Sequence, residues 1–167
     1  MLIDRTKARE FMHAEGLDAL VLAYTENVIA FTDFMHVNSN LIKPRLYYVV
    51  FFSDPRHETV FLVPHQDFDD AVKSTWIKDV RRTAEYVYPG RPDVIVDKIT
   101  AVAEGIVAAG LEGGTIGFED ASLPYGVYKG LTGALPGATF KPASNLLARL
   151  RAIKSPEELS RIKRAMQ

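Results

Sequence analysis

Cysteine is absent from this chain of 167 residues. Its absence excludes disulfide bonds, metal sites built on thiolates and a cysteine nucleophile. A chain of this length can still bury a core without covalent cross-links, because a domain of this size removes most of its surface from water. The apolar fraction of 47% and the charged fraction of 25% are those of an ordinary soluble globular protein.

An excess of charge of either sign is also missing, since the formal net charge is −1. A chain with so little net charge has no general attraction to nucleic acid or to an anionic membrane. No apolar run approaches the ~20 residues of a membrane-spanning helix, and the polar start of the chain lacks the apolar core of a signal peptide. We therefore expect a cytoplasmic protein that binds neither nucleic acid nor membrane.

The motifs of self-contained catalysis are missing as well. There is no H-E-x-x-H pair and no serine in a G-x-S-x-G elbow, and the glycines at 110–117 precede a strand instead of following one. The best metal candidates, His65 and Asp69, would share a helix face, but acids in a first helical turn are stabilised by the helix dipole without a metal. We predict no catalytic residue and no metal ligand in this chain, with a small hydrolase built on His65 and Asp69 as an alternative.

Helical and strand patterns alternate along the chain and indicate layered α/β structure. Gly16-Leu17 and Gly110-Leu111 each join a predicted helix to a predicted buried strand. A helix-then-strand unit used twice favours helices that cover a largely parallel or mixed sheet. The strands are expected at 18–23, 46–52, 58–63, Val80 with 86–88, 115–118 and 137–140, the second and third forming a hairpin.

Helices are expected between these strands, each with an apolar face at helical spacing. They span Asp4 to Gly16, 27–34 as a short helix or a turn, 66–77 with Phe68, Val72 and Trp76 inward, Asp93 to Gly110, Ser122 through Leu131, and Ser144 to Leu150. Asp4, Ser122 and Ser144 are the expected caps of their helices. The polar, irregular stretch 35–44 is predicted to be a loop, and it carries His36 and Asn38, with Arg45 just after it. Because binding residues are often carried by loops on a rigid scaffold, these three are candidate binding residues; a simple connection is the alternative.

The last segment begins an amphipathic helix. Ser155 can cap it, Pro156 suits its first position, and Glu158 completes a capping box. An apolar stripe then follows at helical spacing, formed by Leu159, Ile162 and Met166. Two interpretations stay open: a C-terminal helix that folds back on its own domain, or the first helix of a further domain.

Three segments resemble the N-terminal domain of the creatinase, prolidase and aminopeptidase P family, the pita-bread metallohydrolases. Residues 5–21 look like the first helix and strand of that family, and 27–34 (NVIAFTDF) is similar to its Asn-x-x-Tyr-Leu-Thr-Gly-Phe segment. The most specific is 150–159 (LRAIKSPEEL), which is similar to the family's inter-domain pattern Arg-x-x-Lys-Ser-Pro-x-Glu. Asp33 stands where glycine is usual, and Ala30-Phe31 replaces Tyr-Leu.

The resemblance implies a three-layer α/β/α domain with a mixed sheet of about six strands, similar to a ribonuclease H-like arrangement. It further implies that residues 1–150 form this domain and that 151–167 form the junction and the start of the first helix of a missing catalytic domain. In such families, two divalent metal ions in the C-terminal domain activate a water for attack on a C–N bond.

The same resemblance implies a non-catalytic role for this chain. Such an N-terminal domain shapes the substrate pocket and builds a homodimer, so His36, Asn38 and Arg45 are expected to face a small peptide or amidino substrate, or the second subunit. The chain alone should be inert, while the parent protein should be a metal-dependent hydrolase. A stand-alone domain of the same fold that binds peptides or proteins is the alternative.

Overall fold

The computed structural model describes residues 2–35, 47–84, 87 and 89–166. In these residues a mixed sheet of seven strands runs in the order β5-β4-β3-β2-β1-β6-β7, one strand more than the expected six. The strands are β1 (Ala19–Leu22), β2 (Tyr48–Phe52), β3 (Val60–Pro64), β4 (Asp79–Thr83), β5 (Val94–Ile95), β6 (Thr115–Phe118) and β7 (Thr139–Pro142). The helices are α1 (Arg5–Ala14), α2 (Thr25–Thr32), the 3-10 helix η1 (His65–Asp67), α4 (Phe68–Ser74), α5 (Lys98–Ala108), α6 (Tyr125–Ala134), α7 (Ser144–Ala152) and α8 (Pro156–Ala165).

The centre of the sheet is β1, which is parallel to β6 and antiparallel to β2. β2 and β3 form the predicted antiparallel hairpin, and β3–β4, β4–β5 and β6–β7 are parallel pairs. Since β1 and β6 are parallel, their carboxyl ends lie at the same end of the sheet, and so do the residues that follow them. The candidate functional site lies there.

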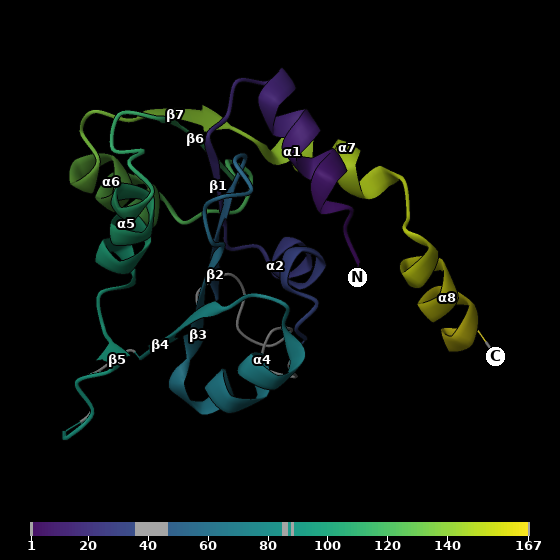
Figure 1. The fold of residues 1–167 in the computed structure, drawn as a ribbon, viewed down its shortest axis with the longest axis horizontal. Coiled ribbons are helices and arrows are strands. Elements are labelled where there is room, and N and C mark those ends of the chain that lie inside the picture. The colour runs from purple at the N-terminus through teal and green to yellow at the C-terminus, as the bar shows by residue number, and fades with distance from the viewer. Residues whose placement is uncertain (1, 36–46, 85–86, 88, 167) are drawn as a thin grey trace.

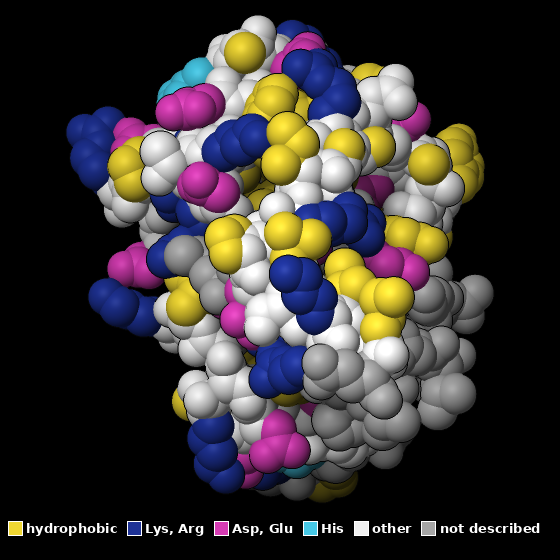
Figure 2. Space-filling model, turned by 90° about the vertical axis from the view of Figure 1, so that its right-hand side faces the viewer, with side chains coloured by type: hydrophobic (Ala, Val, Ile, Leu, Met, Phe, Trp, Pro, Cys, Tyr) yellow, Lys and Arg dark blue, Asp and Glu magenta, His cyan; other side chains and the backbone are white. Residues whose placement is uncertain are grey.

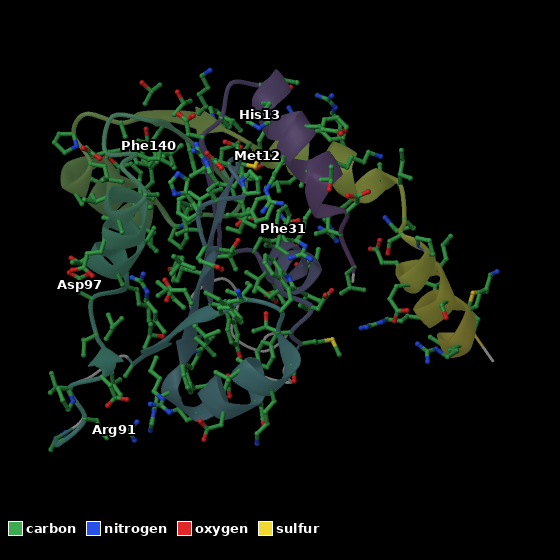
Figure 3. The ribbon with its side chains drawn as sticks, viewed as in Figure 1. Met12, His13, Phe31, Arg91, Asp97 and Phe140 are labelled. Atoms are coloured by element: carbon green, nitrogen blue, oxygen red, sulfur yellow. The ribbon has the colours of Figure 1, made fainter. Side chains whose placement is uncertain are left out.

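Side chains alternate across the central strands and supply two cores, one on each face of the sheet. Figure 1 shows α5 and α6 on one side of the sheet and α1, α2 and α7 on the other. Leu20 and Leu22 pack with α1, α2, α4 and α7, while Ala19 and Val21 pack with α5 and α6. Figure 3 shows Met12 of α1 and Phe31 of α2, from the first core, apart from Phe140, which packs on the second. The three-layer α/β/α prediction is therefore confirmed.

Local signals place several helix ends where the sequence predicts them. The Asp4 carboxylate accepts hydrogen bonds from the amides of Thr6 and Lys7 at the start of α1. After α1, Gly16 takes a left-handed φ of 64°, and the Leu17 amide reaches back to the Met12 carbonyl at 2.9 Å. This left-handed cap turns the chain directly into β1.

Several local predictions are wrong. The helix expected from Asp93 begins only at Lys98, because Asp97 caps it and Val94–Ile95 instead pairs with β4 as the edge strand β5. The helix expected from Ser122 begins at Tyr125, with Pro124 at the N-cap. A proline disfavours the helical conformation of the residue before it, so the helix cannot readily start earlier.

The helix expected at 66–77 is shorter: α4 ends at Ser74 and buries Ala71, while Val72, expected inward, lies exposed. The strand predicted at Val80 is β4, while Tyr86 and Tyr88 of the expected 86–88 extension lie outside the described residues. Ser144 is the first residue of α7 instead of its cap; its amide donates to Asp120, and its hydroxyl accepts from the Ala121 amide.

The last two helices differ in where they lie. α7 packs beside α1, whereas α8 projects away from the three layers (Figure 1). None of the residues of α8 is buried. Viewed from the side of α8, the surface shows hydrophobic side chains among lysine and arginine side chains (Figure 2). In the described parts of the chain, no helix has both the length and the apolar character needed to cross a bilayer.

Candidate functional site

Two of the recognised segments, more than a hundred residues apart in sequence, meet at the carboxyl ends of β1 and β6. Asn27 lies in the first turn of α2, Glu119 directly follows β6, and Arg151 lies near the end of α7. The Asn27 amide nitrogen donates to Glu119 Oε1 at 2.5 Å, and Arg151 donates to Asn27 Oδ1 at 3.1 Å. We call this chain of contacts the junction network.

Glu119 is the buried centre of the junction network, with 1% of its surface exposed. Its Oε2 accepts hydrogen bonds from the backbone amides of Ala23 at 2.5 Å and Tyr24 at 2.6 Å. Burial raises the pKa of the Glu119 carboxyl, and the three N–H donors together with the charge of Arg151 offset part of that rise. The carboxylate thus fixes the turn from β1 into α2 and, through Asn27, the end of α7.

The junction between α7 and α8 follows immediately after Arg151. The Lys154 ammonium donates to the Arg151 carbonyl. Ser155 Oγ accepts from the Glu158 amide at 3.1 Å, and Glu158 Oε2 accepts from the Ser155 amide at 2.8 Å, so the predicted capping box is confirmed. The junction is thus tied to the sheet on one side and starts a well-defined helix on the other.

A cavity of about 210 Å³ opens beside this junction. Apolar side chains from the N-terminal residues, from α2 and from the junction line it, namely Leu2, Ile3, Ala30, Leu150, Ile153 and Pro156. The rest of its lining is polar and mostly charged, with both signs present: Asp4, Lys7, Arg151, Lys154, Ser155 and Glu158. The arrangement offers packing surface and polar groups, which suits contact with another polypeptide segment better than bond-breaking chemistry.

The backbone conformation of Asp33 explains how aspartate can replace the glycine that is usual at this position of the family. It is the residue of the described chain, other than glycine, with a positive φ, 59°, and it ends α2 in the left-handed conformation. Aspartate tolerates this conformation better than most residues, which accounts for its presence where the family usually has glycine. Its Oδ1 also accepts the Leu2 amide at 2.6 Å, a contact that glycine lacks.

The structure describes the predicted metal candidates but not the predicted binding residues. His36, Asn38 and Arg45 lie outside the described residues, so their role stays a prediction. Asp69 faces the Arg82 guanidinium at 3.4 Å, and the ranges that the structure describes hold no group of three or more histidines and acids able to bind a metal ion. The arrangement therefore gives no support to a hydrolase built on His65 and Asp69.

Sequence reasoning missed Glu119. One signal was available: Glu119 is an acid that directly follows the strand predicted at 115–118. That strand and the one predicted at 18–23 each follow a helix and a Gly-Leu pair, so the two could be expected to pair in parallel. Because the carboxyl ends of parallel strands meet at one edge, that acid was placed to reach the amides that follow the first strand.

Comparison with known proteins agrees with this architecture. Residues 5–153 match the model of the creatinase/prolidase N-terminal domain. The chain belongs to this family. The family resemblance and the creatinase-type fold predicted from the sequence are therefore confirmed. A comparison with the curated proteins gives no match.

Solved structures with the same fold come from peptidases. X-Pro aminopeptidase from Thermotoga maritima MSB8 has a TM-score of 0.72 at 14% identity, and the match covers 96% of this chain and 39% of that one. Aminopeptidase P from Streptococcus thermophilus has a TM-score of 0.62 at 22% identity, with 88% and 95% covered. The N-terminal domain of the cytoplasmic peptidase PepQ from Mycobacterium tuberculosis H37Rv has a TM-score of 0.63 at 22% identity, with 88% and 97% covered.

These coverages fall into two groups. The chain spans 37–39% of the Thermotoga aminopeptidase, of Xaa-Pro dipeptidase from Bacillus anthracis and of prolidase from Pyrococcus horikoshii OT3. It spans nearly all of the Streptococcus and Mycobacterium chains, which therefore consist of little more than this domain. At these identities the likeness shows the fold, and the activity of this chain is a matter for proposal.

Proposed function

We propose that this chain is the non-catalytic N-terminal domain of a hydrolase with two divalent metal ions, of the aminopeptidase P and prolidase kind. The observation that carries the proposal is α8, a capped amphipathic helix that buries none of its residues and directly follows the part of the chain that matches the family. We propose a domain boundary near residue 150 and a catalytic domain that covers the apolar stripe of α8. The three longer relatives extend well beyond the matched part, which is consistent with this arrangement.

In this proposal the chemistry belongs to the catalytic domain. Two metal ions held there would activate a water for attack on a C–N bond of a small peptide or amidino substrate. The chain described here would supply part of the pocket wall and the interface of a homodimer, with His36, Asn38 and Arg45 facing the substrate or the second subunit. A cytoplasmic location is part of the proposal, and one structural relative is named as a cytoplasmic peptidase.

The junction network supports a positioning role. It connects the sheet to the last turn of α7 through hydrogen bonds of 2.5 and 3.1 Å, directly before the segment that leads into α8. A catalytic domain attached through α8 would inherit the direction that these contacts give to the junction. The orientation of one domain against the other decides which loop residues reach the substrate.

The activity test compares the 167-residue chain with the longer product of the same reading frame, under Mn²⁺ or Co²⁺, on Xaa-Pro peptides and creatine. We expect metal-dependent turnover only from the longer protein, whose added sequence should supply two Asp, one His and two Glu ligands. Turnover by the 167-residue chain itself would overturn the proposal.

The alternative is a stand-alone domain that binds peptides or proteins. Two solved chains support this alternative, because each consists of little more than this domain. A reading frame that stops at Gln167, or that continues without the five ligands, would favour this alternative.

The loop assignment has a test of its own. In the longer enzyme, His36→Ala and Arg45→Ala should raise KM or weaken dimerisation, because both residues are proposed to face substrate or the second subunit. Exposed His13, on the far end of α1, provides the matched control as His13→Ala. Unchanged kinetics and unchanged assembly in both loop variants would remove the assignment.

A further inference from the structure

A second groove lies at the opposite end of the sheet from the junction network. It has a volume of about 460 Å³ and is bordered by the start of α1, by the turn between β2 and β3 and by the segment that connects α4 to β4. The residues that matter here are Arg5, Arg9, His57, Glu58, Trp76 and Lys78. Neither the family match nor the proposed function assigns a role to this groove.

Two arginines of α1, Arg5 and Arg9, lie one helical turn apart and place two positive charges along the groove. The Arg5 guanidinium lies 4.0 Å from the centroid of the Trp76 ring, and the Arg9 guanidinium lies 4.9 Å from the Phe51 ring. Arg9 Nε also donates to the Phe52 carbonyl at 3.3 Å, and the Trp76 indole is itself fixed by a 2.9 Å bond to the Phe31 carbonyl. Both cations are thus held in place by the rings beneath them.

Among the residues that the structure describes, neither guanidinium forms an ion pair within 4.0 Å. Asp54, whose carboxylate is paired with Arg56, attracts Arg9 only at longer range. In that same part of the chain, each of the other arginines contacts a carboxylate within 4.0 Å or, for Arg151, the amide oxygen of Asn27. Burial lowers the pKa of Arg9, and the positive charge of Arg5 lowers it further, while the negative charge of Asp54 offsets part of this effect. Arg5 and Arg9 are like charges one helical turn apart, so they repel each other. An anion placed between them would remove this repulsion.

The acids that border the groove are already engaged. The Asp4 carboxylate accepts the amides of Thr6 and Lys7, so the first-turn amides of α1 are not what a ligand would use. Glu58 lies 3.7 Å from the ammonium of Lys78, which is 83% exposed and can turn toward a ligand. Two fixed guanidinium forks and one mobile ammonium suit a group that carries two charges and several oxygens better than a carboxylate.

We propose that Arg5, Arg9 and Lys78 form a binding site for a phosphate group, either free inorganic phosphate or the phosphate of a small metabolite. Each guanidinium would donate to phosphate oxygens from the edge that its aromatic ring leaves open. The ammonium would close the site from the solvent side. This inference does not depend on the proposed function, because it concerns residues and a surface that the hydrolase proposal does not use.

The only tryptophan of the chain is Trp76, so its fluorescence reports on this groove directly. Inorganic phosphate is titrated against sodium chloride at constant ionic strength. We expect a saturable change in the Trp76 emission with a dissociation constant on the order of 1 mM, and a rise in Tm with phosphate concentration. A linear response equal to that of chloride would overturn the site.

Variants separate the site from general charge effects. Arg5→Gln and Arg9→Gln should each weaken phosphate binding by about tenfold, equivalent to ~1.4 kcal/mol, and reduce the phosphate-dependent rise in Tm accordingly. Arg161→Gln is the matched control, since Arg161 is an exposed arginine paired with Glu157 on α8 and does not border the groove. If Arg9→Gln does not fold, Arg5→Gln alone decides, because its guanidinium makes no described hydrogen bond; undiminished affinity in Arg5→Gln contradicts the proposal.

Two further titrations identify the ligand. Acetate at the same ionic strength should bind at least about tenfold more weakly than phosphate, and equal affinity would overturn the assignment to phosphate. Ribose 5-phosphate that binds more tightly than inorganic phosphate would identify a phosphorylated metabolite as the source. Tighter binding of inorganic phosphate would identify the free ion.

Discussion

The two C-terminal helices, α7 and α8, share an amphipathic pattern but differ in what covers their apolar faces. α7 buries Leu146, Leu147 and Leu150 in the core beside α1. In α8 and its C-cap, by contrast, Leu159, Ile162 and Met166 are 47%, 45% and 82% exposed. Periodicity therefore identifies an apolar face, and only the tertiary structure shows whether something covers it.

The comparison predicts a large difference between matched substitutions. Leu147→Ala should lower the free energy of unfolding by about 2–5 kcal/mol, because it removes buried methyl groups and leaves a cavity. Leu159→Ala, the same substitution on α8, should change it by no more than ~0.5 kcal/mol, as at other exposed positions. Urea unfolding of both variants checks this.

The same pair sharpens the functional proposal. In a longer protein whose catalytic domain covers α8, the cost of Leu159→Ala should rise toward that of Leu147→Ala. An equally small effect in both contexts would show that the stripe of α8 stays uncovered.

The junction network predicts an effect of intermediate size at its buried centre, Glu119. Glu119→Gln should lower the unfolding free energy by about 1–3 kcal/mol, because an amide cannot accept all three N–H donors and leaves a buried one unpaired. Exposed Glu112→Gln is the matched control. Denaturation midpoints of the two variants give the comparison, and equal values would mean that the network adds nothing.

The pH dependence of Glu119 follows from its raised pKa. The folded domain retains the proton to a higher pH than the unfolded chain does, so the Glu119 contribution to stability is present at low pH. It is lost as the pH rises through the folded-state pKa. The difference in unfolding free energy between the wild type and Glu119→Gln should therefore vary with pH in this direction, and a difference that does not vary would contradict it.

The smallest effect is expected at the start of α8. Ser155→Ala removes one side of the capping box and should cost about 1 kcal/mol of local helix stability, seen as a loss of helical chemical shifts over residues 156–165. The global unfolding midpoint should not move, since α8 contributes no buried residue. Ser160→Ala, in the middle of the same helix, should not reduce helicity; a loss of helicity there equal to that of Ser155→Ala would contradict the capping interpretation.

The fold was predictable from the sequence where local signals and long-range packing agree. Asp4, Gly16 and the Ser155 box each act through contacts with near neighbours, and each lies where the pattern places it. The start of α5 was not predictable in this way, because Val94 and Ile95 fit a helical period but gain more by pairing with β4. That pairing depends on a strand that is distant from any local motif.

The junction network was harder to predict than the fold. Glu119 carries no motif, and its partners Ala23, Tyr24 and Asn27 are more than ninety residues away in sequence. Only the parallel pairing of β1 with β6 brings them together. The groove at Arg5 and Arg9 likewise depends on rings from β2 and from the segment after α4, which sequence spacing does not connect.

The hydrogen bond from the Leu2 amide to Asp33 has a practical consequence. It anchors the first residues of the domain against the end of α2, and Leu2 and Ile3 are themselves buried. An affinity tag fused directly ahead of residue 2 would crowd this anchorage and the neighbouring cavity at once. Recombinant versions of the domain should therefore separate any such tag by a flexible spacer, or cleave it off before assembly is measured.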